Sequence, residues 1–240
     1  MESFKTPTET VTLPSKGLVY PEGHPYASGQ VEIRYMTAAD EDIIRSEKKM
    51  RAGTAIDDLM KALMVDNSGF EDLIVGDKNA IMIACRILGY GSEYKVSMGT
   101  KTYTFDLDKI QNKSFDESLF SNRKNEFDYK LPVRGNTVTF KILTHADEKK
   151  INEELEGLKK IIAKGADLPR TTTQLKYIIT SIDGDNSTKT IREYVDKHLL
   201  ARDSISLRKY MQSMMPDVNM VQEIDGKEVM IPITMKFFYV

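Results

Sequence analysis

A repeated segment constrains the fold of this chain more than any other feature of its sequence. Residues 31–44 read VEIRYMTAADEDII and residues 138–151 read VTFKILTHADEKKI, and the two segments align without a gap. Upstream of each lies a second matching pair, LPSKG at residues 13–17 and LPVRG at residues 131–135. Similarity at two linked places predicts that the chain builds one structural unit twice.

Each copy of the repeat predicts a β-hairpin. In the second copy, apolar residues alternate with polar neighbours before the turn RGN, and they alternate again on the way back. This period of two is typical of a hairpin with one buried face. The outgoing apolar residues are Phe127, Tyr129, Leu131 and Val133.

A capped helix follows each predicted hairpin. Thr37 and Thr144 precede helical stretches, and each is followed three residues later by an aspartate, Asp40 or Asp147. This is the spacing of a capping box, in which side chain and backbone at the helix start bond reciprocally. We therefore interpret these acidic residues as structural rather than catalytic.

The two copies differ at the hairpin tip. The first copy carries an additional segment between the matching flanks, LVYPEGHPYAS at residues 18–28. Prolines stiffen this loop, and a preorganised loop loses little entropy when it docks on a partner. We therefore expect it to contact another protein. The candidate contact residues are Leu18, Tyr20, Pro21, His24 and Tyr26.

The sequence closes on the aromatic segment PITMKFFYV, whereas terminal residues are commonly polar and frayed. Two interpretations stay open. Either the second hairpin buries this segment, or its aromatic side chains anchor a partner protein. The candidate anchors are Phe237, Phe238 and Tyr239.

The order of elements persists beyond the repeat while the residues diverge. Helical periodicity recurs twice in each half, beginning with the runs at residues 53–65 and 171–182, and Asp77 or Asp203 precedes the last helical run. A predicted strand pair closes each half. We therefore predict an α+β fold of two similar halves, each a hairpin, three helices and a closing hairpin, from an internal duplication. The predicted boundaries are an N-terminal extension at 1–10, a first α+β repeat at 11–110, a polar linker at 111–126 and a second α+β repeat at 127–240.

Composition bears on the class of partner. The 34 basic and 36 acidic residues give a net charge of -2, without the uniform positive field of a protein that coats nucleic acid or anionic lipid. No apolar run is long enough to span a membrane. The single cysteine, Cys85, permits no intrachain disulfide, which favours a reducing compartment. We expect neither a nucleic-acid partner nor a membrane partner.

No pattern typical of catalysis or cofactor binding emerges. The SKG at residues 15–17 lacks the glycine-rich run that precedes Gly-Lys-Ser/Thr in a phosphate-binding loop. The three histidines share no metal-ligand spacing with Cys85. We expect no catalytic, cofactor-binding or metal-binding residue and no small-molecule substrate. The alternative from a different class is a nucleotide-binding enzyme that uses Lys16 or Asp77.

The succession of motifs along nearly the whole chain resembles one known family. The segments are LPSKGLVYPEGHP, VEIRYMTAADEDII, VGDKNAIMIACRILGYG, LPVRGNTVTFKILTHADEKKI, LLARDSISLRKYM, PDVNM and IPITMKFFYV. In content and order they resemble the T4-type bacteriophage baseplate protein family, the small hub and hub-assembly proteins of contractile tails. Relatives in that family often carry Cys pairs at the two closing hairpins, but here those positions read VSMGTKTY and QEIDGKEV, so no metal is carried over.

The resemblance implies a non-enzymatic structural or assembly component of a phage tail baseplate hub that acts through protein contacts. Its partners would be other baseplate hub or tail-assembly proteins. It would reside in the tail baseplate of the virion, and in the host bacterial cytoplasm during assembly. The alternative within the same biology is a transient tail-assembly chaperone that binds tape-measure or hub proteins and is absent from the virion.

Overall fold

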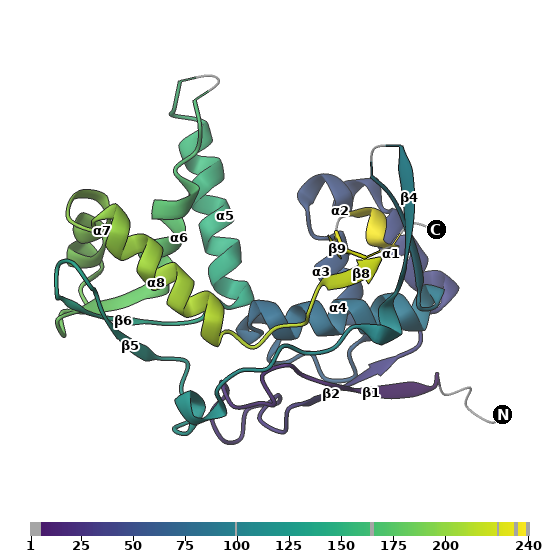
Figure 1. Cartoon of the computed structure of the whole chain (residues 1–240). Coiled ribbons are helices and arrows are strands. Elements are labelled where there is room, and N and C mark those ends of the chain that lie inside the picture. Colours follow the sequence, from purple (N-terminus) through teal and green to yellow (C-terminus); the bar gives the residue numbers. More distant parts are fainter. Residues whose placement is uncertain (1–5, 99, 164–165, 225, 233–234, 239–240) are drawn as a thin grey trace.

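The structure is a computed structural model that describes residues 6–98, 100–163, 166–224, 226–232 and 235–238. Within these residues the chain is a mixed α+β protein, with eight α-helices and nine strands in small antiparallel sheets (Figure 1). We refer to residues 6–110 as the first half and to residues 127–238 as the second half.

The first half contains β1 (Thr8–Thr12), β2 (Gln30–Arg34), α1 (Ala38–Arg45), α2 (Glu47–Ala52), α3 (Ala55–Leu63), η1 (Phe70–Asp72), α4 (Val75–Tyr90), β3 (Glu93–Met98), β4 (Lys101–Asp106) and η2 (Leu107–Lys109). A short helix, η3 (Glu117–Phe120), lies between the halves. The second half contains β5 (Phe127–Lys130), β6 (Thr137–Phe140), α5 (His145–Lys159), α6 (Arg170–Ile178), β7 (Ile179–Ile182), α7 (Thr188–Lys197), α8 (Ala201–Met214), β8 (Val221–Ile224), β9 (Lys227–Met230) and η4 (Met235–Phe238).

The two predicted opening hairpins are confirmed. Strands β1 and β2 pair antiparallel with Val11 opposite Val31, and β5 and β6 pair with Phe127 opposite Phe140. The prediction was wrong at Val133, because β5 ends at Lys130 and the chain turns earlier. Pro132 lacks the N–H group that a longer strand would need.

Each half has four α-helices in its described part, where three were predicted. The unpredicted α2 is short and is capped by the Ser46 side chain. The unpredicted α7 is likewise capped by Ser187. In addition, the helix predicted at residues 171–182 ends at Ile178, and its last residues form β7, which pairs with β6. The β-branched run Ile-Ile-Thr-Ser-Ile favours this strand over a longer helix.

Both predicted capping boxes are confirmed. In each one, the aspartate accepts hydrogen bonds from the hydroxyl and the backbone N–H of the threonine. Each aspartate also binds a basic residue at the end of the preceding strand or directly after it: Arg34 lies 2.7 Å from Asp40, and Lys141 lies 2.7 Å from Asp147. The Arg34 hydrogen bonds lower the pKa of Asp40 to about 2. The acidic residues therefore join each helix start to its hairpin.

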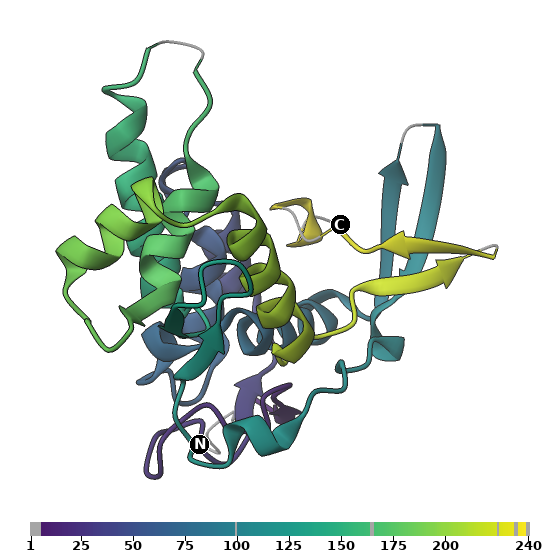
Figure 2. The ribbon, with the colours of Figure 1, turned by 60° about the vertical axis from the view of Figure 1, so that its left-hand side comes forward.

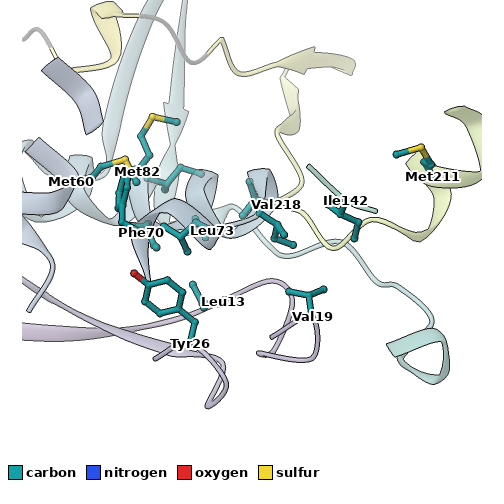
Figure 3. Close-up of a cluster of buried hydrophobic side chains, with 14 of the residues drawn as sticks. Leu13, Val19, Tyr26, Met60, Phe70, Leu73, Met82, Ile142, Met211 and Val218 are labelled. Carbon is teal, nitrogen blue, oxygen red and sulfur yellow. The ribbon is translucent and has the colours of Figure 1, made fainter. Parts of the chain in front are cut away.

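One continuous set of buried apolar side chains runs through both halves (Figure 3). It includes Leu13 and Phe70 from the first half and Ile142 and Met211 from the second. The segment between the halves is also packed, since Phe120 is fully buried against Phe127. Residues 111–126, expected to be a linker, therefore contribute to the interior.

The closing hairpin of the second half packs on the first half. Figures 1 and 2 show β8 and β9, in yellow, beside β4 and the other blue elements of the first half. The Gln222 side chain donates a 2.8 Å hydrogen bond to the Asp106 carbonyl. Between α8 and β8, the chain crosses α4 at Gly76. An added Cβ on Gly76 would lie 2.1 Å from the Pro216 carbonyl oxygen. Only glycine permits so close a crossing.

A buried arginine holds the last described segment on the first half. Arg86 of α4 donates from Nε to the Phe237 carbonyl at 2.8 Å. Its two terminal nitrogens donate to the carbonyls of Gly91 and Glu93 at 2.7 Å and 3.1 Å. The Tyr94 ring packs edge-on against Phe237 at 4.9 Å between centroids. One guanidinium therefore ties α4, β3 and η4 together.

None of the helices in the described part of the chain combines the length and the apolar character needed to cross a lipid bilayer.

We expect Arg86→Met to lower the free energy of unfolding by about 3 kcal/mol, because three buried carbonyls lose their donor. Urea denaturation measures this loss, and amide exchange of β8 and β9 should accelerate in the variant. The matched control is Arg45→Met, since Arg45 is exposed and forms an ion pair with Glu41 of its own helix. Its effect should stay below about 0.5 kcal/mol. Equal effects of the two substitutions would contradict the role of Arg86.

Candidate functional site

The loop at residues 18–28 leaves the hairpin through a narrow neck. Lys16 and Gly17 both have positive φ angles, 52° and 76°. An added Cβ on Gly17 would lie 2.5 Å from the Ala27 carbonyl oxygen, and one on Gly29 would lie 2.5 Å from the Lys16 carbonyl carbon. The two chain segments that form the neck are therefore in direct backbone contact. Only glycine fits at Gly17 and Gly29 without displacing the chain.

A buried carboxylate fixes the start of the loop. Asp77, in the first turn of α4, is fully buried and accepts hydrogen bonds from the Ser15 N–H at 2.9 Å and the Ser15 hydroxyl at 2.6 Å. The Tyr20 hydroxyl donates to the same carboxylate at 2.7 Å and accepts from the Ile74 N–H at 3.3 Å. Burial raises the pKa of Asp77, and the Ser15 and Tyr20 donors oppose that rise. The loop is therefore built around an internal carboxylate.

The aromatic residues of the loop stack on one another. The Tyr20 and His24 rings are parallel at 4.9 Å, and the Tyr26 ring meets His24 edge-on at 5.3 Å. The His24 ring also lies 3.2 Å from the Asp72 carboxylate. Of the five predicted contact residues, Tyr20 and Tyr26 are buried, Leu18 and His24 are half-buried, and Pro21 is exposed. Both tyrosines pack inside their own half, and Tyr20 also lines the cavity described below, so of the two only Tyr20 stays a candidate contact residue.

The predicted aromatic anchors at the other end of the chain are also internal. Phe237 and Phe238 are buried, and they pack on each other edge-on. Tyr239 lies outside the described residues. Of the two interpretations left open by the sequence, burial of this segment holds for the two phenylalanines. The first half covers them, rather than the second hairpin by itself.

A cavity of about 490 Å³ opens between the loop and the second half. Val19, Tyr20 and Ile74 supply its apolar wall, while the rim carries both cationic and anionic side chains. The charged rim residues are Asp72, Arg123, Lys124 and Glu126. Among the described residues, the cavity rim therefore carries two cationic and two anionic side chains.

The far wall of the cavity comes from the second half. Thr144 lies at the start of α5, and Thr180 lies on β7. The Thr180 hydroxyl is buried and has no hydrogen-bond partner within the described residues. An apolar wall, a mixed polar rim and an unused hydroxyl suit an inserted side chain of a protein partner. Pro21 and His24 of the predicted loop line this cavity, whereas Leu18 is not part of its lining.

The two halves meet beside this cavity. The His145 N–H of α5 donates to the Leu73 carbonyl at 2.8 Å, and Ile74 forms an isolated β-bridge with Thr144. The buried His145 ring packs edge-on against Phe70 at 4.9 Å. The loop and the start of α5 are therefore held in a fixed relation.

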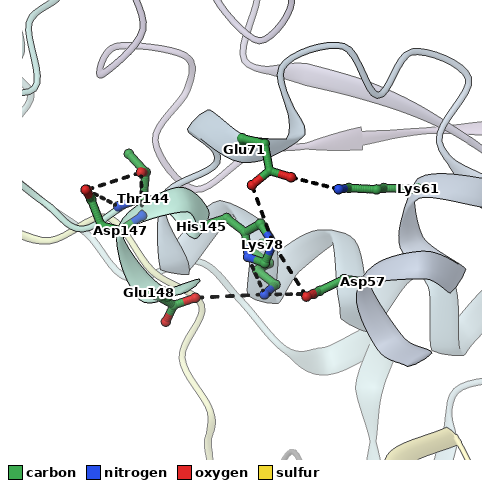
Figure 4. A network of polar contacts seen from close by, with 8 residues as sticks. All are labelled: Asp57, Lys61, Glu71, Lys78, Thr144, His145, Asp147 and Glu148. Carbon is green, nitrogen blue, oxygen red and sulfur yellow. Dashed lines mark hydrogen bonds and ion pairs between the residues drawn. The ribbon is translucent and has the colours of Figure 1, made fainter. Parts of the chain in front are cut away.

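A polar network surrounds the His145 ring (Figure 4). Lys78 Nζ lies 2.9 Å from His145 Nδ1 and 2.9 Å from the Asp57 carboxylate, and His145 Nε2 lies 3.5 Å from Asp57. Glu148 and Glu71 lie farther out, 3.8 Å from Lys78 and 3.9 Å from His145. Burial, followed by the Lys78 charge, lowers the pKa of His145. The neutral ring therefore accepts from Lys78 at Nδ1 and donates from Nε2 toward Asp57.

Lys16 and Asp77, the two residues considered for a nucleotide site, each bind other residues of the chain. The Lys16 side chain is exposed and pairs with Glu117, whereas the Asp77 carboxylate is enclosed by Ser15 and Tyr20. Within the described residues, no three His, Cys, Asp or Glu side chains gather as a metal site would require.

Two polar residues beside this cavity, Lys78 and His145, were missed by sequence reasoning. They contact each other across a long sequence separation, so no local pattern marks them. Asp77 could have been recognised from the sequence. Asp77 and Asp203 both lie at the start of a predicted helix, and each follows a Leu-Pro-x-basic-Gly segment earlier in its half.

The lowered pKa of His145 predicts a pH dependence of stability. Below the ordinary His pKa of 6.5, the unfolded chain binds the proton more readily than the folded one, so the folded state loses stability as pH falls. We expect wild type to lose stability relative to His145→Gln between about pH 7.5 and 5.5 in chemical denaturation. His198→Gln, at an exposed histidine, serves as the control and should follow wild type. A pH-independent difference between wild type and His145→Gln would exclude this role.

Comparison with known proteins gave no match to any protein-family model, curated protein or solved structure. What the site can do is therefore inferred from its own residues. Its geometry is that of a cavity with balanced charge beside a rigid loop, at the junction of two halves.

Proposed function

We propose that this chain is a non-enzymatic structural or assembly component of the baseplate hub of a contractile phage tail. The succession of motifs along nearly the whole sequence, which resembles that family, carries the proposal. Its partners are other baseplate hub or tail-assembly proteins. Its location is the tail baseplate of the virion, and the host bacterial cytoplasm during assembly.

The geometry of the junction supports a role in protein contacts. Two side chains of the loop are fixed by internal contacts, since Tyr20 donates to Asp77 and His24 lies against Asp72. The loop is therefore held in one shape, and Pro21, Glu22 and Pro25 are among the residues that it exposes. A rigid wall beside a cavity loses little entropy on association, which favours docking of another protein.

We further propose that the two halves arose by internal duplication. The first support lies in the neck of each hairpin, where Leu13 N–H donates to Gly29 and Leu131 N–H donates to Asn136. These partners match when the loop at residues 18–28 is omitted from the alignment. In both halves, the returning strand of the hairpin pairs with the residue that directly follows a helix. The pairs are Ile33–Met64 in the first half and Phe140–Ile179 in the second.

A second support is the buried aspartate. Asp77 accepts from the Ser15 N–H, and Asp203 accepts from the N–H groups of Val133 and Arg134 at 2.8 Å and 3.2 Å. Both aspartates are fully buried in the first turn of a helix, and both bind the turn that follows Leu-Pro. In each half, a buried aspartate thus joins the start of a helix to the turn of the hairpin.

The duplication predicts parallel effects of two substitutions. Asp77→Ala should lower the free energy of unfolding by about 3 kcal/mol, and Asp203→Ala by about 2 kcal/mol, because buried donors lose their acceptor. Asp42→Ala, at an exposed position of α1, should change it by less than about 0.5 kcal/mol. Urea denaturation of the three variants provides the comparison. If Asp203→Ala behaves like Asp42→Ala, the two aspartates are not equivalent.

Mass spectrometry of purified contractile-tailed particles tests the function. The hub proposal predicts peptides of this chain at constant ratio to tail proteins in particles and in isolated baseplates. Absence from particles, combined with a complex with tape-measure or hub proteins in infected cells, would indicate the transient chaperone instead. Absence from both contradicts either role. A nucleotide-dependent heat in calorimetry that Lys16→Ala abolishes would indicate the enzyme class.

A further inference from the structure

In the first half, the loop at residues 18–28 covers the residues that flank the buried Asp77. In the second half, the equivalent residues beside Asp203 are exposed. Ser15 and Ile74, which flank Asp77, are 0% and 1% exposed. Their counterparts Val133 and Leu200 flank Asp203 and are 47% and 40% exposed. Large aliphatic side chains exposed on both sides of one buried carboxylate mark an unusual surface.

Tyr20 is the residue that closes this place in the first half. Its hydroxyl accepts from the N–H of Ile74, the residue that precedes α4. Leu200 precedes α8 in the same way, and its N–H has no hydrogen-bond partner among the described residues. The second half thus offers the donor and the apolar surface, but not the tyrosine.

Two cationic side chains lie beside this place, while the exposed Asp183 binds Asn136 and Thr137 of the neighbouring turn. Arg134 and Arg202 are both exposed, and neither forms an ion pair within the part of the chain that the structure describes. The Asp203 carboxylate is buried, and its oxygens bind the backbone N–H groups of Val133 and Arg134. The exposed charges therefore favour an acidic partner. We name Val133, Arg134, Leu200 and Arg202 the α8 patch.

We propose that the α8 patch docks an acidic, tyrosine-bearing segment of a partner protein. The tyrosine ring lies over Val133 and Leu200, and its hydroxyl accepts from the Leu200 N–H, as Tyr20 does from Ile74. Acidic side chains of the segment meet the two arginines. This inference rests on the proposed duplication, and it gives the partner contacts of the proposed function a definite chemistry. A nucleic acid is less well matched, because two aliphatic side chains occupy the space between only two cations.

The test uses the full chain and a fluorescein-labelled peptide of ten residues. The peptide keeps the Val-Tyr-Pro-Glu order of the loop and has glutamate elsewhere. Fluorescence anisotropy should show saturable binding, weakened at least roughly tenfold by Leu200→Asp and by the double variant Arg134→Glu, Arg202→Glu. Replacement of the peptide tyrosine by alanine should weaken binding to a similar degree. A peptide with lysine for glutamate should not bind.

The matched control is Val65→Asp, because Val65 is a similarly exposed valine, 56%, in the first half. It should bind the peptide like wild type, and thermal unfolding verifies that every variant is folded. No binding to wild type overturns the proposal. The proposal is also overturned if the double arginine variant binds the peptide as tightly as wild type does, or if the tyrosine-free peptide binds as tightly as the original. Tighter binding of a short DNA duplex than of the peptide would overturn it as well. Particle composition is measured independently, so failure here is distinguishable from failure of the hub assignment.

Discussion

The buried carboxylate of Asp77 is the interaction on which the rest of this structure depends. Burial of an unpaired carboxylate costs several kcal/mol, so it must be fully hydrogen-bonded. Ser15 and Tyr20 supply three bonds from one side, and the start of α4 favours negative charge from the other. The hairpin, the loop and the longest helix are thereby fixed to one another.

The position of the cavity follows from this arrangement. Tyr20 forms part of the cavity wall because its hydroxyl is held by Asp77. Ile74 lies beside it, and its bridge to Thr144 brings the second half to the opposite side. The position of the site therefore follows from how the start of α4 and the Asp77 carboxylate are hydrogen-bonded.

Local features of the fold could be predicted from the sequence, and distant ones could not. The opening hairpins and the capping boxes at Thr37 and Thr144 depend on neighbours a few residues apart, and the structure confirms them. Strand β7 was predicted as helix because its pairing with β6 is a tertiary contact that helical periodicity does not register.

The candidate site shows the same limit. Aromatic residues such as Tyr20 and Phe237 have the composition of either a core or a docking surface, and only their neighbours decide which. Tyr20 has Asp77 beneath it, and Phe237 has Arg86 on its carbonyl, each from a distant part of the chain. The exposed residue Val133 was predicted on a strand, so the α8 patch could not be recognised from sequence.

The packing of Phe237 and Phe238 on the first half has a consequence for the order in which the protein is made. The first half is synthesised before these two residues, which complete its core. Until they have been synthesised, Arg86 lacks the Phe237 carbonyl that it binds in the folded protein. The first half therefore reaches its native packing only after Phe238 has been made, so the two halves gain their final stability together.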